Sequence, residues 1–201
     1  RLIDRFFMGK VVPFAGAGIS INAEYKDKRL ADTNIMAKTV AKKLFDLYDK
    51  KEQWAKWCRC SLKCKNHKET MCLLKKQSLD KLCEIYTWAT GEKGFRSLIE
   101  KVLSIPDFSK LSPQAAHRYI SLLAREELID EIITTNYDCC FEKAYQQTFI
   151  DRPTDAALVI TDLDGYRQFS GRFYTKSGNR CLKIYKINGC AGKLKQNKNY
   201  P

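Results

Sequence analysis

The sequence has 201 residues, enough for one sizeable domain with its own hydrophobic core. Its composition is 44% hydrophobic and 29% charged, as in ordinary globular proteins, and no apolar run is long enough to span a membrane. The net charge of +13 is compatible with a solvated surface, a partner-binding surface or the steering of a phosphate-rich ligand. Direct nucleic-acid binding is less favoured, because no base-reading motif accompanies the scattered lysines.

The apolar patterns predict strands that alternate with helices along the chain. The first strand is predicted over residues 11–15 and ends in the glycine turn 16–20. Helices are predicted over 36–48, from 78, over 94–103 and from Ser112-Pro113-Gln114, with Ser112 as the cap of the last. A strand over 128–135, a helix over 140–147, loops with short strands over 151–177 and a strand over 180–187 follow. We interpret the chain as a segment of a longer protein, because it starts at Arg1 and ends in a polar run.

This alternation predicts an α/β fold with a Rossmann-like parallel sheet. The helices between the first two strands far exceed a simple crossover, so we expect a helical insertion at about residues 30–127. Phe14, directly before the glycine turn, is expected to pack in the sheet.

Nine cysteines are present, and they follow no evenly spaced secreted framework, which predicts reduced thiols and a cytoplasmic protein. One cluster, in the helical insertion, could bind zinc through Cys58, Cys60, Cys64, His67 and Cys72. Because its spacing is irregular, we favour reduced thiols on a helical hairpin and keep zinc as the alternative.

Three of the predicted strands end in small or polar turns, at residues 16–20, 134–138 and 188–189. In open α/β sheets, ligands bind beyond the carboxyl ends of the strands. The three turns are therefore expected to converge on one pocket.

The glycine turn can hold a phosphate group. Gly16 and Gly18 let backbone N–H groups approach a diphosphate closely, and Ser20 can cap the next helix or donate its hydroxyl. A short Gly-x-Gly also occurs in ordinary strand–helix turns, which stays open as the alternative.

The second turn, Thr134-Thr135-Asn136-Tyr137-Asp138, follows a buried strand directly. Asn136 offers a donor and an acceptor, which suits ribose hydroxyls or a positioned water, and Asp138 can accept from an amide such as the carboxamide of nicotinamide. Alternatively, either side chain caps the next helix.

Together, Gly16-Ala17-Gly18-Ile19-Ser20, Thr134-Thr135-Asn136-Tyr137-Asp138 and Ile187-Asn188-Gly189 resemble the three signature motifs of the sirtuin fold. Ser112-Pro113, Ala116-His117 and Leu122-Leu123 also resemble this family. The Asn-Tyr-Asp form and the long helical region are more similar to the bacterial sirtuin-like NADases of antiphage defence than to histone deacetylases. The resemblance covers roughly residues 10–192.

The resemblance implies that NAD is the substrate and that nicotinamide is released through an oxocarbenium-like ribose, whose positive charge the site stabilises. It also implies further sheet strands downstream. The catalytic positions that it implies are Asn136, Asp138 and Asn188. The NAD-binding residues that it implies are Ala15, Gly16, Ala17, Gly18, Ser20, Thr135, Asn136, Tyr137, Asp138 and Gly189.

The sequence departs from the family at residue 188, where the family has a histidine that acts as a base on the ribose hydroxyls. Asn188 cannot accept a proton near neutral pH, so we expect the chain to bind NAD but to hydrolyse it poorly. The substitution is either engineered or a natural impairment. His117 matches a helical family position away from the chemistry, and we interpret it as structural.

A second departure concerns the paired cysteines of the sirtuin zinc module, because Cys190 stands alone after the third motif. A protein deacylase is therefore a lesser alternative, below a module that senses NAD or ADP-ribose without hydrolysis. The partners that the resemblance implies are further copies of the chain and a fused or separate sensor, such as a helicase-like ATPase, through which nucleic acid would act.

Overall fold

The computed structural model describes residues 4–5, 8, 11–26, 28–29, 32–48, 77–148, 157–169, 171, 174 and 181–193. The candidate zinc ligands Cys58, Cys60, Cys64, His67 and Cys72 lie outside these residues. The chain divides into two compact units, one formed by residues 1–30 and 105–200 and the other by Ala31–Ser104. Among the described helices, none combines the length and the hydrophobicity that crossing a membrane requires.

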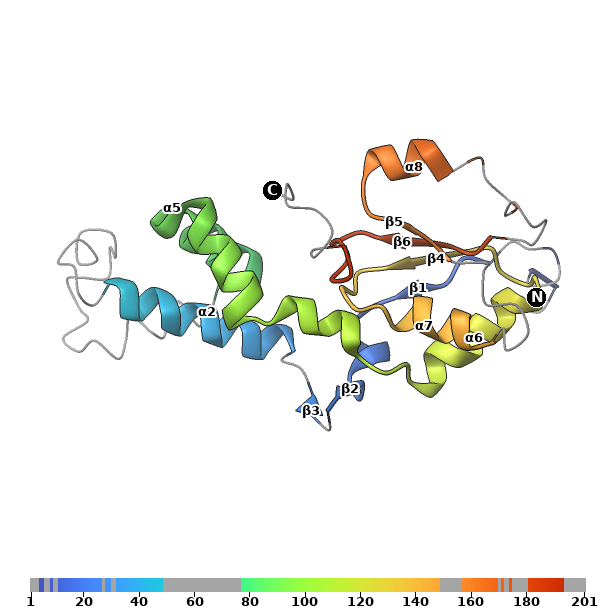
Figure 1. The fold of residues 1–201 in the computed structure, drawn as a ribbon, viewed down its shortest axis with the longest axis horizontal. Helices are drawn as coiled ribbons and strands as arrows, with labels where there is room; N and C mark the ends of the chain where they lie inside the picture. Colours follow the sequence, from blue (N-terminus) through green and yellow to red (C-terminus); the bar gives the residue numbers. More distant parts are fainter. Residues whose placement is uncertain are drawn as a thin grey trace. The chain divides into compact units, whose positions relative to one another are not determined.

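The first unit contains a four-stranded sheet whose paired strands all run parallel, in the order β1-β4-β6-β5 (Figure 1). The strands are β1 (Phe14–Ala15), β4 (Glu131–Thr134), β5 (Leu158–Ile160) and β6 (Lys183–Lys186). Helices alternate with these strands along the chain. The fold is therefore α/β and Rossmann-like in kind, as the sequence predicted.

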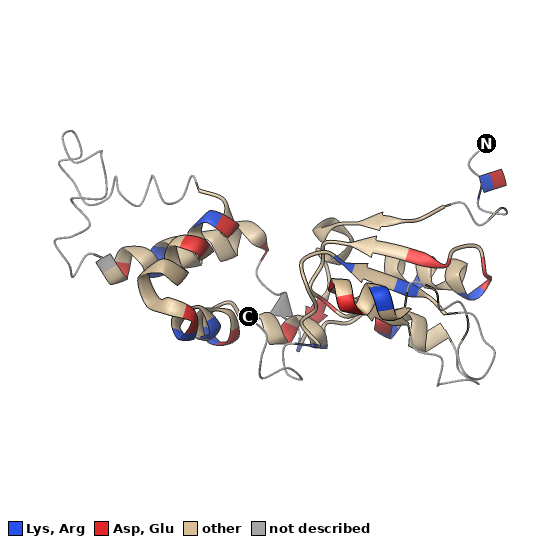
Figure 2. Ribbon diagram, turned by 90° about the horizontal axis from the view of Figure 1, so that it is seen from above, with Lys and Arg blue, Asp and Glu red and all other residues tan. Residues whose placement is uncertain are grey.

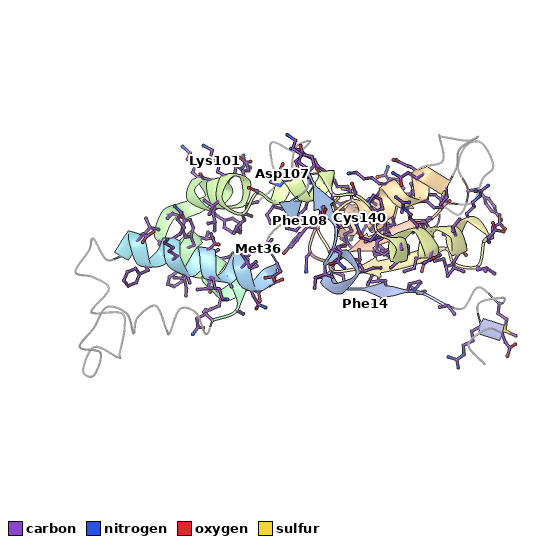
Figure 3. All side chains as sticks on the ribbon, turned by 90° about the horizontal axis from the view of Figure 1, so that it is seen from below. Phe14, Met36, Lys101, Asp107, Phe108 and Cys140 are labelled. Atoms are coloured by element: carbon purple, nitrogen blue, oxygen red, sulfur yellow. The ribbon has the colours of Figure 1, made fainter. Side chains whose placement is uncertain are left out.

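The helical elements of this unit are η1 (Ala17–Ser20), η4 (Ile105–Lys110), α6 (Ala115–Arg125), α7 (Cys140–Thr148) and α8 (Leu163–Phe169). A short antiparallel pair, β2 (Glu24–Tyr25) and β3 (Lys28–Arg29), follows η1. Phe108 of η4 packs against a small buried cluster that includes Cys140 of α7, and Figure 3 shows the two side chains close together.

The core lies between the sheet and the helices α6 and α7. Ile132 of β4 and Ile184 of β6 are register partners with no exposed surface, and they pack in one cluster with Phe141 of α7. Because side chains alternate along a strand, Tyr185 points to the opposite face, where its ring lies 6.3 Å from that of Tyr166 in α8. Helices therefore cover both faces of the sheet.

The second unit is built from α2 (Thr33–Tyr48), α5 (Leu79–Ser97) and the π-helical turn η3 (Leu98–Val102). Val40, Ala41 and Leu44 are fully buried at helical spacing, and α2 packs against α5. The predicted insertion of residues 30–127 thus falls into both units, since residues 105–127 belong to the unit of the sheet.

Three local predictions need correction. Phe14, labelled in Figure 3, is 67% exposed, because its neighbour Ala15 faces the core and Phe14 therefore points to the opposite side of the edge strand β1. The cap of α6 is Gln114 and not Ser112, because Gln114 and His117 form a reciprocal capping box that starts the helix at Ala115. The predicted loop over 151–177 contains the short strand β5 but also α8, whose first turn is fixed by a 2.7 Å hydrogen bond from Gly165 N to Asp162 Oδ1.

The charged residues of both signs are interspersed over the described helices (Figure 2). This distribution is typical of a solvated surface and differs from the single-sign stripe of a nucleic-acid-binding helix.

Replacing Ile184 by alanine is expected to lower the free energy of unfolding by about 2–5 kcal/mol, because a buried side chain of the sheet core is truncated. Ile187→Ala is the matched control, since Ile187 follows the same strand but is 60% exposed, and its loss should stay below about 1 kcal/mol. Urea unfolding of both variants measures the difference, and equal losses would contradict this core.

Candidate functional site

The carboxyl ends of β1, β4 and β6 lie at one edge of the sheet. Ala15 pairs with Thr134, and Thr134 pairs with Lys186. The hydrogen bonding continues past the strands, from Thr135 N to Ala15 O at 3.1 Å and from Ile187 N to Thr134 O at 3.0 Å. The strand order therefore brings the three turns to one edge of the sheet, as predicted, while their shared pocket remains a prediction.

The hydroxyl of Ser20, which is partly buried, is the centre of a hydrogen-bond network at this edge. It lies 2.8 Å from Asp138 Oδ2, 3.0 Å from Asn136 Nδ2 and 3.1 Å from His117 Nε2. These three partners come from the turn after β4 and from α6, and each is at most 7% exposed. Four side chains from three chain segments thus meet at one oxygen.

The protons of this network follow from its partners. Gln114 N donates to His117 Nδ1 at 3.1 Å, so Nδ1 is an acceptor and Nε2 carries the proton of a neutral imidazole. Ser20 Oγ then accepts from His117 Nε2 and Asn136 Nδ2, and donates its own proton to Asp138. His117 therefore cannot remove the proton of Ser20, and the network differs from a serine-hydrolase triad, in which the histidine accepts it.

His117 lies directly beside Ser20, one of the predicted site residues. Its ring also packs edge-on against Phe141, with the ring centroids 4.9 Å apart. Burial lowers the pKa of His117 below its usual value of 6.5, although the carboxylate of Asp138 and the backbone at Gln114 act in the opposite direction. The neutral form is thus part of the folded structure.

Within this network, Asn136 carries a hydrogen-bond acceptor that remains unpaired. Its amide nitrogen donates to Ser20, and its backbone N–H donates to Thr134 Oγ1 at 3.1 Å. Its Oδ1 is buried and has no hydrogen-bond partner among the described residues. Asn136 does not cap α7, so the alternative interpretation of this residue as a helix cap is wrong.

Asp138, by contrast, does cap α7. Its Oδ1 accepts from Cys140 N at 2.9 Å, while Oδ2 accepts from Ser20. Both carboxylate oxygens are therefore engaged inside the protein. This geometry favours the capping interpretation of Asp138 over direct contact with a ligand.

The glycine turn leaves the sheet as the short helix η1, with Gly16 as its cap. Ala15 is buried, whereas Ala17 and Gly18 are exposed. A Cβ at Gly16 would lie 3.8 Å from Thr135 Oγ1, and one at Gly18 would meet no heavy atom within 4 Å. Packing within the described residues therefore does not require glycine at 18.

The third turn is held to the second. Asn188 is exposed, and its Nδ2 donates to Thr135 O at 3.1 Å. Gly189 has a φ of +89°, a left-handed conformation that favours glycine, and Ala191 N donates to Tyr137 O at 2.8 Å. The backbone thus joins the segments after β4 and β6 over several residues.

A second buried polar network, which the sequence analysis missed, lies beside the first. Lys186 Nζ is 2.6 Å from Glu142 Oε1 and also donates to the backbone carbonyl of Asp138. Cys190 Sγ lies 3.5 Å from Lys186 Nζ and 3.7 Å from Cys139 Sγ. The only sequence signal was a lysine at an inward position of a strand, four residues before a cysteine.

Among the described residues, two groups each place three potential metal ligands within 4.8 Å of one another. The first group is His117, Asp138 and Cys140, and the second is Cys139, Glu142 and Cys190. In the first group, both ring nitrogens of His117 are engaged by the protein. In the second, the ammonium group of Lys186 already supplies the positive charge. Neither arrangement favours a divalent cation.

No protein-family profile and no curated protein matches the sequence. Function is therefore inferred from the geometry of this edge and from the motif resemblance.

Ser20→Ala is expected to lower the free energy of unfolding by at least about 2 kcal/mol, because it leaves three buried groups without their common partner. The control is Ser109→Ala, which removes one hydrogen bond, to Pro106 O at 2.6 Å, and should cost about 0.5–1.5 kcal/mol. Chemical denaturation measures both, and a Ser20→Ala loss no larger than that of the control would contradict the network.

The lowered pKa of His117 predicts that stability is lost as the pH falls. The unfolded chain takes up the imidazole proton near pH 6.5 and the folded protein only below it, so the contribution is complete above this pH and declines beneath it. In His117→Gln, the slope of unfolding free energy between pH 5 and 7 should flatten.

Asp162→Asn is the control for this slope. The pKa of Asp162 is lowered by the backbone hydrogen bond from Gly165, so its contribution is lost only at more acidic pH. The control should keep the native slope between pH 5 and 7. An unchanged slope in His117→Gln would show that the imidazole is not held neutral.

Proposed function

We propose that this chain is the NAD-binding part of an NAD⁺ glycohydrolase of the sirtuin-like class, which releases nicotinamide from NAD⁺, and that the whole protein acts in antiphage defence by depleting NAD. The observation that carries the proposal is the unpartnered, buried Oδ1 of Asn136, at the edge where three motif-bearing strand ends meet. A buried acceptor without a partner is costly, and a ligand donor would satisfy it.

Asn136 would act on the ribose next to nicotinamide. Its Oδ1 can accept from a ribose hydroxyl or from the attacking water, and its partial negative charge would favour the positive charge that develops on the sugar as the bond to nicotinamide breaks. Ser20, His117 and Asp138 would be positioning residues, since their polar atoms are used to hold the amide of Asn136.

The glycine turn would receive the phosphates of NAD. Ala17 and Gly18 are exposed at the end of β1, and a Cβ at Gly18 would meet no heavy atom of a described residue within 4 Å outside its own turn. This openness supports a close approach of a diphosphate to the backbone. The described residues thus offer an acceptor for the ribose and an open backbone turn for the phosphates.

Asn188 would make this chain a poor catalyst. Its side chain lies at the same edge, bonded to Thr135 O, but it cannot take a proton from a ribose hydroxyl. The same observation favours a second candidate, a module that binds NAD or ADP-ribose without hydrolysis. A protein deacylase is less supported, because Cys190 is not part of a Cys-x-x-Cys pair of the kind found in the sirtuin zinc module.

The partners that we propose are further copies of the chain or a sensor protein, such as an ATPase that itself detects nucleic acid. Assembly would then control NAD consumption. These partners follow from the family resemblance alone.

The deciding experiment compares nicotinamide release by the full-length protein with Asn188 and by its Asn188→His variant, with the assembly state measured in parallel. Restoring a base is expected to raise the rate by about 100-fold or more. Asn188→Gln is the control, since it keeps an amide and supplies no base. Adding Asn136→Ala to Asn188→His should abolish the gain.

Calorimetric titration with NAD separates the two candidates. Binding by the protein with Asn188, without a gain in Asn188→His, would favour the sensing module. Absence of binding in both forms would overturn the proposal, and release of nicotinamide only with an acetylated peptide would favour the deacylase.

A further inference from the structure

Two cysteines from distant parts of the chain lie side by side next to the candidate site. Cys139 directly precedes α7 and Cys190 follows β6, and their sulfur atoms are 3.7 Å apart. Cys190 is buried, while Cys139 is partly exposed, so the pair borders solvent. A disulfide requires about 2.05 Å between the sulfurs, which a small side-chain movement could reach.

The backbone holds the two segments in this arrangement. Ala191 N donates to Tyr137 O at 2.8 Å, and Lys186 Nζ donates to the carbonyl of Asp138. Tyr137 and Asp138 lie within two residues of Cys139, and Lys186 and Ala191 lie within four residues of Cys190. The sulfurs therefore stay close without being covalently linked.

The surroundings of the pair favour a reactive thiolate. Lys186 Nζ lies 3.5 Å from Cys190 Sγ. The hydrogen bond from Cys139 lowers the pKa of Cys190 to about 5, with Lys186 acting in the same direction and burial against it. The same hydrogen bond, together with burial, raises the pKa of Cys139. Cys190 is therefore the more acidic thiol of the pair, although the carboxylate of Glu142 also lies 3.8 Å from its sulfur.

We propose that Cys139 and Cys190 form a peroxide-reactive dithiol that closes into an intramolecular disulfide. The Cys190 thiolate attacks one oxygen of hydrogen peroxide, the O–O bond breaks, and the leaving hydroxide takes a proton to form water. The sulfur of Cys139 then attacks the sulfenic acid at Cys190. As the S–O bond breaks, the proton of Cys139 goes to the departing hydroxide, and a second water forms.

Two other described cysteines, Cys140 and Cys83, lack this combination. Burial raises the pKa of Cys140, whose sulfur lies 3.8 Å from the carbonyl of Ser112. Burial also raises the pKa of Cys83 in α5, to about 11. Both are expected to remain thiols at neutral pH and to react slowly, so they serve as internal references.

The disulfide would link the segment that carries Asn136 and Asp138 to the segment that carries Asn188 and Gly189. Oxidation would thus fix the spacing of the second and third motif turns. Control of NAD binding by this linkage rests on the proposed function, whereas the dithiol itself does not.

The test treats the purified, reduced full chain with hydrogen peroxide, alkylates the remaining thiols in denaturant and maps tryptic peptides by mass spectrometry. The expected product joins peptide 126–143 to peptide 187–193, and dithiothreitol should separate them. Because peptide 126–143 contains both Cys139 and Cys140, the Cys140→Ser variant is the matched control and should keep the link.

The link should be lost completely in Cys139→Ser and in Cys190→Ser, and Cys139→Ser should accumulate a dimedone adduct on Cys190. A second measurement needs no variant: iodoacetamide at pH 6 should modify Cys190 of the native protein before Cys83 and Cys140. Unlinked peptides after peroxide treatment, or faster modification of Cys83 or Cys140, would overturn the dithiol. Neither result depends on whether NAD binds.

Discussion

The parallel pairing of β1 and β6 with the two sides of β4 is the constraint on which the candidate site depends. Ala15, Thr134 and Lys186 stand in one row of the sheet, so the chain leaves the sheet three times at the same level. Ser20 can reach Asn136 only because β1 and β4 end at the same level of the sheet. The register matters equally, because a slip of β6 by one residue would turn Lys186 to the opposite face, away from Glu142, and would place Ile184 outside the core.

Asp138 joins the two buried networks that grow from this edge. Its side chain accepts from Ser20 and from the first turn of α7, while its backbone carbonyl accepts from Lys186. Burial of charged groups is unfavourable unless each is paired, and here the pairing fixes the directions in which the chain leaves β4 and β6. The nicotinamide end of the proposed site and the thiol pair are therefore continuous through a single residue. A change at Cys139, the next residue along the chain, would reach Asn136 over a short path of hydrogen bonds.

The sequence predicted those parts of the fold in which one local pattern dominates. The three strand ends were recognised because apolar runs stop at glycine or polar residues, and the buried stripe of α2 because its period is helical.

Long-range partners were not predictable in the same way. His117 is an ordinary helical residue in the sequence, and only its contact with Ser20 brings it to the site. Lys186 looks like a surface charge until Glu142 of α7 is placed opposite. The helix α8 was missed because it has seven residues and none of them is buried, which leaves no apolar face to detect.

Asn188 supports the fold of this sheet edge, but it cannot supply the base that the proposed hydrolysis needs. Its amide donates to Thr135 O and so ties the third turn to the second, a bond that the N–H of an imidazole could equally make. The sheet edge therefore keeps its shape without a base at this position. The histidine that the structure describes cannot take over that role, because His117 accepts from Gln114 N at one nitrogen and donates to Ser20 from the other. Under the proposed function, the groups that would hold NAD are retained, while the proton acceptor needed to cleave it is missing, so binding and hydrolysis depend on different residues of the same edge.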